Sequence, residues 1–383
     1  MANYDREQYD KALLSSALSR RSFLRKAGLG VLGLAALGTG TALSACSSDS
    51  GGTAASQDTA GGTGDAGSDL SKVTLRIGDI YGWDYLKSLF EFAGVADTPY
   101  TVEYTTFLGV NPAIEALAAD QVDLIQSSSI PPLFAAQASN GGNFKIIANG
   151  DAYYKTSFDP VHTEITQGVL AAPDSGVSKI ADLKGRKVGF VQNTTAHYFL
   201  AKLLDQSGLA WGDIEPIELP LEDGASALLS NQVDAYAVYG MTYISALKGG
   251  GIPIAAADEI LAPGGHFYGN ILASPAIISD PLQADAIADF LNRLNTAGLW
   301  VSTEGLEEWN RHTYEKLGYA TEEEGLEYLT KSTSKITPLS KEAQAFEQDV
   351  ADVFYDLGLF EKPIDVPALY DDTVSVKLEK LQA

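Results

Sequence analysis

Two stretches of the chain, 111 positions apart, almost repeat each other. They read Ala116-Leu117-Ala118-Ala119-Asp120-Gln121-Val122-Asp123 and Ala227-Leu228-Leu229-Ser230-Asn231-Gln232-Val233-Asp234. Each joins the end of a helical run to the start of an apolar strand, and any such turn favours polar residues. The shared Gln-Val-Asp triplet, with the same order of elements around both copies, indicates two related lobes.

Short strands alternate with helical runs around both copies. Near the first, periodicity predicts strands over 73–77, 101–107, 122–125 and 144–148, and helices over 83–92, 112–119 and 131–138. Near the second, it predicts strands over 187–191, 214–219, 233–238 and 252–256, and helices over 195–206, 225–229 and 242–247. After Ser274 the pattern is mainly helical, over 280–303, 306–317, 321–331 and 340–357.

The predicted fold class is therefore α/β, because strands that alternate with helices imply a parallel or mixed sheet. We expect two lobes joined by a hinge that the chain crosses twice, with a ligand cleft between them. The crossings are placed near residues 168–171 and 269–272. The first lobe then comprises 71–167 and 272–383, including the C-terminal helices, and the second comprises 168–271.

The first 45 residues have the pattern of a signal peptide. A twin-arginine motif at 19–26 precedes a Gly- and Ala-rich apolar run over 27–43, which is shorter than the about 20 apolar residues of a membrane-spanning helix. Leu43-Ser44-Ala45-Cys46 resembles a bacterial lipobox, so lipidation of Cys46 is expected. Residues 46–70 are rich in Ser, Gly and Ala and should form a flexible tether. These features predict export through the twin-arginine (Tat) pathway and a body anchored at the outer face of the cytoplasmic membrane by its lipid alone.

Composition excludes several classes of function. The net charge of −24 becomes −27 when the first 45 residues are set aside. Nucleic-acid binding needs a basic surface and is not expected. Cys46 is the only cysteine and the four histidines lack metal-ligand spacing, so neither a disulfide nor a metal site is expected. The sequence contains no phosphate-binding loop and no Gly-x-Ser-x-Gly motif. We expect a monomer that has no cofactor and no catalytic residue.

The candidate binding residues follow the predicted strands. In open α/β sheets, ligands bind beyond the carboxyl ends of strands, where helix N-termini offer free N–H groups to an anion. The turns at these places are short, rich in Gly, Ser or Thr, and flanked by aromatic residues. The candidates are Trp83, Gly109, Ser127, Ser128, Ser129, Gln192, Asn193, Thr194, Thr195, His197, Tyr239 and Gly240.

Each candidate also has an ordinary structural explanation. Asn193 or Thr194 can cap the following helix and do nothing more. The Ser-rich turn before Pro131 is a good helix start, and Trp83 can be a core residue between helix and sheet. The two glycines can simply make turns, and a lone helical histidine is more often packed or exposed than in contact with a ligand.

The body resembles the substrate-binding proteins of nitrate, sulfonate, taurine and bicarbonate ABC importers, a group related to binding proteins for thiamine-pyrimidine precursors. The match runs from about 73 to 372 and rests on residues 113–124 with the Ser-rich turn, on 180–189, and on 194–200, which are similar to the aliphatic-sulfonate branch. The resemblance implies a periplasmic-binding-protein-like type II fold that closes on a small organic anion and presents it to ABC permease and ATPase subunits. It further implies that the turns at 127–129 and 193–197 hold the oxyanion, while aromatic residues near Trp83 and Tyr239 contact the organic part.

One stretch departs from the family pattern. The family often has Trp-Asp-Pro where this chain has Tyr239-Gly240-Met241. The missing acidic group disfavours a taurine-like ammonium ligand, and Gly and Met leave room for a bulkier one. A thiamine-pyrimidine precursor or another heterocycle is the alternative ligand. Desulfinases that share this fold rely on a cysteine nucleophile, which the body lacks; a lipoprotein acting as an adhesin or sensor is a further alternative.

Overall fold

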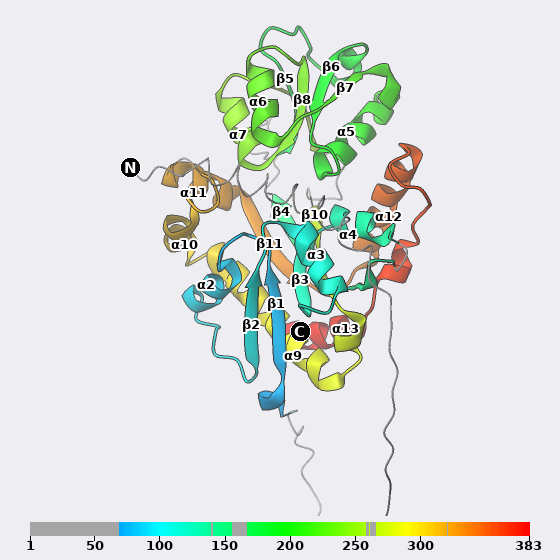
Figure 1. Ribbon diagram of the computed structural model, residues 1–383. Coiled ribbons are helices and arrows are strands. Elements are labelled where there is room, and N and C mark those ends of the chain that lie inside the picture. The colour runs from blue at the N-terminus through cyan, green and yellow to red at the C-terminus, as the bar shows by residue number, and fades with distance from the viewer. Residues whose placement is uncertain (1–68, 139–140, 155–166, 258–259, 261–265, 320) are drawn as a thin grey trace, which may run out of the picture. The chain divides into compact units, whose positions relative to one another are not determined.

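The computed structural model describes residues 69–138, 141–154, 167–257, 260, 266–319 and 321–383, which belong to one compact unit that spans 65–383. The predicted signal peptide, Cys46 and nearly all of the tether lie outside the described residues. Among the described helices, none is long and apolar enough to cross a bilayer. Figure 1 labels most of the helices and strands of the unit.

A six-stranded sheet combines strands from the first and last parts of the unit. Its order is β11-β4-β10-β3-β1-β2. β1, β2 and β3 are parallel, β10 is antiparallel to β3 and β4, and β11 is antiparallel to β4. The carboxyl ends of β1 to β3 therefore meet at one edge. The strands are β1 (Thr74–Asp79), β2 (Thr101–Thr106), β3 (Leu124–Ser128), β4 (Lys145–Tyr154), β10 (His266–Ala273) and β11 (Ser332–Thr337).

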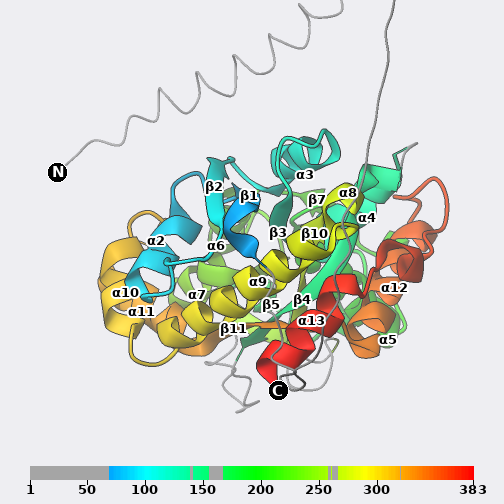
Figure 2. The ribbon, with the colours of Figure 1, turned by 90° about the horizontal axis from the view of Figure 1, so that it is seen from below.

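Helices cover both faces of this sheet because its strands bury side chains alternately on each face. Ile125 and Leu272 belong to the hydrophobic cluster that includes residues of α3, α4 and α12, whereas Leu124 and Ile271 belong to the cluster that includes residues of α9. Figure 2 shows α9 and α13 side by side across the sheet. The helices are α2 (Tyr85–Phe92), α3 (Val110–Ala118), α4 (Ile130–Ala136), α8 (Pro275–Ile278), α9 (Pro281–Val301), α10 (Leu306–Thr313), α11 (Glu322–Lys331), α12 (Lys341–Asp356) and α13 (Thr373–Gln382).

A five-stranded sheet occupies the middle of the chain, in the order β7-β6-β8-β5-β9. β6, β7 and β8 are parallel and β5 is antiparallel to β8 and β9, which is the pattern of β1, β2, β3, β10 and β4. The two sheets with their helices confirm the predicted α/β class. The strands are β5 (Gln167–Ala171), β6 (Lys187–Phe190), β7 (Glu215–Glu218), β8 (Ala235–Tyr239) and β9 (Ile252–Ala256), and the helices are α5 (Thr195–Gln206), α6 (Leu221–Leu229) and α7 (Gly240–Lys248).

The two copies of the sequence repeat fold alike. Asp120 and Asn231 end α3 and α6 at positive φ, 54° and 56°, a backbone conformation that Asn and Asp tolerate. The carboxylates of Asp123 and Asp234 then accept the main-chain N–H of Arg76 and Lys187 at 2.8 and 2.9 Å. Because Arg76 and Lys187 are also 111 positions apart, the structural repeat extends over a strand as well as a turn.

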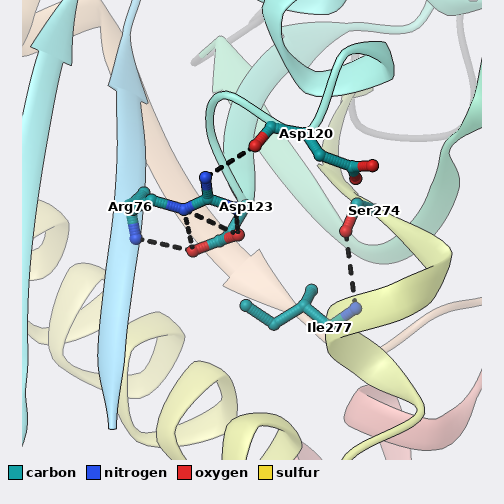
Figure 3. A network of polar contacts seen from close by, with 5 residues as sticks. All are labelled: Arg76, Asp120, Asp123, Ser274 and Ile277. Atoms are coloured by element: carbon teal, nitrogen blue, oxygen red, sulfur yellow. Dashed lines mark hydrogen bonds and ion pairs between the residues drawn. The ribbon is translucent and has the colours of Figure 1, made fainter. Parts of the chain in front are cut away.

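Figure 3 shows the polar contacts around Arg76 and Asp123 in the first copy of the sequence repeat. The Arg76 Nε donates to both Asp123 carboxylate oxygens at 3.1 and 3.2 Å, and Arg76 Nη1 donates to the Asp120 carbonyl at 2.6 Å. The Asp123 carbonyl accepts the N–H of Ser274 at 3.2 Å, and the Ser274 hydroxyl accepts the N–H of Ile277 in α8. Asp123 thus joins β1, β3 and the start of α8.

Some elements differ from those expected. The helix over 195–206 and the strand over 252–256 have the predicted bounds, but β11 and α13 lie where no element was predicted. β11 follows α11 without an intervening glycine or proline. It is mostly polar, so its sequence lacks the alternation of apolar and polar residues that predicts a strand. The stretches placed at the hinge lie inside β5 and β10, and the chain changes sheet between β4 and β5 and between β9 and β10.

Candidate functional site

The candidate residues fall on the carboxyl edges of the two sheets. Trp83, Gly109 and the three serines follow or end β1, β2 and β3, and residues 192–197 and 239–240 follow β6 and β8. Each set shares one edge because its strands are parallel. Thr194 also interacts with the Tyr239 hydroxyl, so two turns of the second sheet meet.

The start of α5 has unused hydrogen-bond donors. Thr194 precedes the helix in an extended conformation, but its hydroxyl donates to the Val191 carbonyl at 2.7 Å and does not cap the helix. Tyr198 is the first residue whose N–H is bonded back, to the Thr194 carbonyl at 3.2 Å. Within the described part of the chain, the N–H groups of Thr195, Ala196 and His197 have no hydrogen-bond partner. Three such donors at the positive end of a helix dipole suit an anion.

Three other helices, α8, α9 and α12, have first-turn N–H groups that are occupied by side chains. Ser274, Asp280 and Ser340 accept main-chain hydrogen bonds at the starts of α8, α9 and α12. The start of α2 is also occupied, because the buried Asp79 carboxylate accepts the N–H of Leu86 at 2.7 Å. Burial raises the pKa of Asp79, and this hydrogen bond opposes the shift. The start of α2 is therefore a poor place for an anion.

The Ser-rich turn offers fewer donors than its sequence suggests. The Ser127 hydroxyl donates to the Ser128 carbonyl at 2.8 Å, and Ser128 is exposed. The Ser129 hydroxyl is buried without a hydrogen-bond partner among the described groups. Pro131 and Pro132 have no N–H, so the first turn of α4 provides little beyond the Ile130 amide.

The two candidate glycines leave their backbones open. Gly109 and Gly240 have φ of 97° and 66°, and nothing lies within 4 Å of the place where a Cβ would be. α3 and α7, which begin at or after these residues, have no side-chain cap from the preceding residue. Both requirements, a positive φ and close access to the main chain, are met by glycine alone at little cost.

His197 is a packed residue in the structure. Its side chain is 3% exposed and lies among Phe190, Trp211 and Phe354, with ring centroids at 4.7 to 5.2 Å. Burial lowers the pKa of His197 to about 4, so the ring is neutral near pH 7. Its Nδ1 accepts the Asn193 N–H at 3.4 Å, which fixes the turn before α5.

Gln192 and Asn193 shape the same turn. With its amide nitrogen toward Glu218, Gln192 donates to that carboxylate at 3.0 and 3.1 Å. Asn193 has φ of 57°, the left-handed conformation that lets the chain turn sharply from β6 into α5. Both residues therefore have structural roles beside the free N–H groups.

Trp83 belongs to an aromatic cluster at α10. Its ring lies 6.4 Å from Trp309 and 5.9 Å from His312, and Lys316 Nζ lies 4.3 Å from the ring centre. Trp83 Nε1 is buried without a hydrogen-bond partner among the described groups. The neighbouring Tyr81 is instead 44% exposed. The sequence pointed to Tyr81 only through its position directly after the first strand, β1.

Helices from the C-terminal part of the chain touch the helices of the five-stranded sheet. Lys248 of α7 pairs with Glu327 of α11 at 2.6 Å. Asp349 of α12 accepts hydrogen bonds from Tyr198 and Lys202 of α5 at 2.6 and 3.0 Å. These contacts hold α11 and α12 against the second sheet's helices, and Figure 1 shows the same neighbours.

Residues 156–303 match the family described as NMT1/THI5 like. An aliphatic sulfonates-binding protein of Escherichia coli (strain K12) is 30% identical over 262 residues, which are 66% of this chain and 74% of that protein. A protein of the same description from Bacillus subtilis (strain 168) is 26% identical over 304 residues, 78% of this chain and 82% of that protein.

Solved structures share the fold. The periplasmic aliphatic sulphonate binding protein SsuA from Escherichia coli aligns with a TM-score of 0.64 at 23% identity, over 78% of this chain and 92% of that one. The alkanesulfonate-binding protein SsuA from Xanthomonas axonopodis pv. citri bound to MOPS aligns at 0.62 and 22% identity, over 78% and 98%. The desulfurization enzyme DSZB aligns at 0.57 and 15% identity, over 80% and 99%.

The sheet order and these alignments establish the type II periplasmic-binding-protein fold. A role in binding a solute follows from the relatives in sequence, which are binding proteins. The chain belongs to the family of ABC transporter substrate-binding proteins that includes the aliphatic sulfonate-binding proteins.

Proposed function

We propose that the protein is an exported, lipid-anchored binding protein that captures a sulfonate and delivers it to an ABC importer without chemical change. The observation that carries the proposal is the start of α5, where three N–H groups lack partners beside the hydroxyls of Thr194, Thr195 and Tyr239. A sulfonate has three acceptor oxygens and a permanent negative charge, which such donors match. Its relatives' names support this ligand class.

The parts of the chain have distinct roles in this proposal. Residues 1–45 are the twin-arginine signal peptide, Cys46 is the lipidated residue, and the tether extends to residue 70. The lobes 71–167 with 272–383, and 168–271, close on the ligand by a hinge motion, and the monomer binds the permease. Gly109, Gly240 and the serines at 127–129 supply further main-chain and hydroxyl contacts.

A net acidic protein can bind an anion at this place. Exposed charges are screened over about 8 Å at physiological ionic strength. Hydrogen-bond donors at the start of α5 act at contact distance, and no carboxylate accepts their N–H groups in the described residues. Local donors therefore outweigh the overall charge.

Thermal unfolding of the purified protein with a panel of ligands tests the ligand class. Ligand at 100 times its dissociation constant should stabilise the fold by about 2.7 kcal/mol. We expect this shift with sulfonates that lack an amine, and a smaller one with taurine, sulfate, nitrate and bicarbonate. Tighter binding of taurine would contradict the argument from Gly240 and Met241. A shift only with a pyrimidine precursor would keep the binding role and replace the sulfonate.

Replacement of Thr195 by Val tests the location of the anion, because Val keeps the shape and removes the hydroxyl. Loss of a hydrogen bond to a charged group costs about 1.5–3 kcal/mol, so sulfonate affinity should fall about tenfold to a hundredfold. Thr373 is the matched control because it is also the first residue of a helix, α13. Thr373→Val should leave the titration curve unchanged; equal affinities of the Thr195→Val and wild-type proteins would place the anion elsewhere.

A further inference from the structure

Tyr81 and Leu108 form an exposed apolar pair on the carboxyl edge of the six-stranded sheet. Leu108 is 77% exposed and Tyr81 is 44% exposed. An isolated antiparallel bridge joins the two residues, and Gly82 and Gly109 donate main-chain hydrogen bonds to Phe107 and Ile80 at 2.9 and 3.0 Å. Single exposed apolar residues are common, but here two neighbouring loops fix a pair beside Gly109.

Tyr81 packs against a second ring and still keeps part of its surface open to water. Its ring stacks on Tyr85 with centroids 4.0 Å apart and planes 29° apart. Desolvation and the nearby Tyr328 hydroxyl raise the pKa of Tyr81 to about 12. Tyr81 therefore presents part of its ring to solvent while another part packs against Tyr85.

Tyr328 of α11 relates this apolar pair to the proposed anion site. Tyr328 interacts with Tyr81 and also with Tyr239, whose hydroxyl interacts with Thr194 at the start of α5. α11 also contacts α7, which begins directly after Tyr239, so Tyr328 lies close to both the apolar pair and the turn beside the start of α5. This arrangement suits a ligand that has an apolar body at one end and an oxyanion at the other.

We propose that Tyr81 and Leu108 hold the aromatic ring of an aryl sulfonate whose sulfonate group lies at the start of α5. The proposal rests on the proposed function above. An exposed ring that already stacks on a second ring offers a flat face for a third, in the offset geometry that aromatic rings prefer. Leu108 covers the edge of the bound ring, and the open space at Gly109 accommodates it. Short alkyl chains would not reach this pair.

Titration calorimetry of the full chain with 2-naphthalenesulfonate and methanesulfonate tests the proposal. Tyr81→Leu should weaken naphthalenesulfonate binding about tenfold and change methanesulfonate binding less than twofold. Leu108→Ser should have the same selectivity with a smaller effect. Tyr355→Leu and Leu381→Ser are matched controls, because these side chains are 43% and 50% exposed on α12 and α13, and they should alter neither affinity.

The two ligands separate this proposal from the one on which it rests. Binding of methanesulfonate with equal or greater affinity than naphthalenesulfonate would overturn the aryl preference and keep a sulfonate-binding protein. Equal losses for both ligands in Tyr81→Leu would also overturn it, because they would indicate a general disturbance of the site. Binding of neither sulfonate would overturn both proposals. Thermal unfolding of each variant verifies that it is folded during the titration.

Discussion

Replacement of Glu347 by Gln should stabilise the protein at alkaline pH and leave its stability nearly unchanged at pH 5. Glu347 lies on α12 and is fully buried. Burial raises the pKa of its carboxyl to about 8, and Asn270 and Tyr370, which face it, offset only part of the shift. Among the described groups, neither carboxylate oxygen has a hydrogen bond of normal geometry.

The direction of the pH effect follows from the pKa of Glu347 in the unfolded chain and in the folded protein. In the unfolded chain the carboxyl ionises near pH 4.3, whereas in the folded protein it keeps its proton until about pH 8. Stability from the neutral carboxyl is thus complete below pH 4.3 and is lost as pH rises through 8. The loss is on the order of 5 kcal/mol, and Gln, which does not ionise, avoids it.

Urea unfolding of the wild-type and Glu347→Gln proteins at pH 5, 7 and 8.5 measures this difference. The advantage of the variant should be small at pH 5 and increase at each step. Glu342→Gln is the control, because Glu342 lies on the same helix and is exposed. A constant difference between variant and wild type over this range would show that Glu347 ionises at its ordinary pKa.

Much of the fold could be predicted because it depends on local pattern. The repeated Gln-Val-Asp turn and the alternation of strands with helices predicted both sheets, and the candidate turns lie at the carboxyl ends of strands as expected. β11 could not be predicted, because its residues pair with β4 only after the chain returns from the second sheet. A polar edge strand lacks the alternation of apolar and polar residues by which strands are predicted.

Side-chain roles at the site depend on contacts from distant parts of the chain. His197 is buried because Phe354 of α12 packs on it, and Trp83 packs in an aromatic cluster with Trp309 of α10. Neither partner is near its contact in sequence. Tyr81, two residues before Trp83, stays exposed, and the sequence alone could not distinguish these two roles within one turn.

The two copies of the repeat predict unequal effects of the same substitution. Asp123→Ala should lower the free energy of unfolding by about 3 kcal/mol, because it leaves the Arg76 guanidinium and main-chain N–H without their buried acceptor. Asp234→Ala should cost about 1 kcal/mol, because that carboxylate is 25% exposed against 4% for Asp123, so water can replace it.

Urea unfolding of both variants, followed by far-UV circular dichroism and tryptophan fluorescence, measures the two losses. If Asp123→Ala does not fold, Asp123→Asn is the milder substitute. Its loss of unfolding free energy should lie between those of Asp123→Ala and Asp234→Ala. Equal losses at the two positions would show that burial does not set the strength of the pair. If the two sheets unfold as separate units, each substitution should move a different transition, since Asp123 joins β1 to β3 and Asp234 joins β6 to β8. Unequal shifts of a single transition would instead mean that the two halves of the repeat unfold as one cooperative unit.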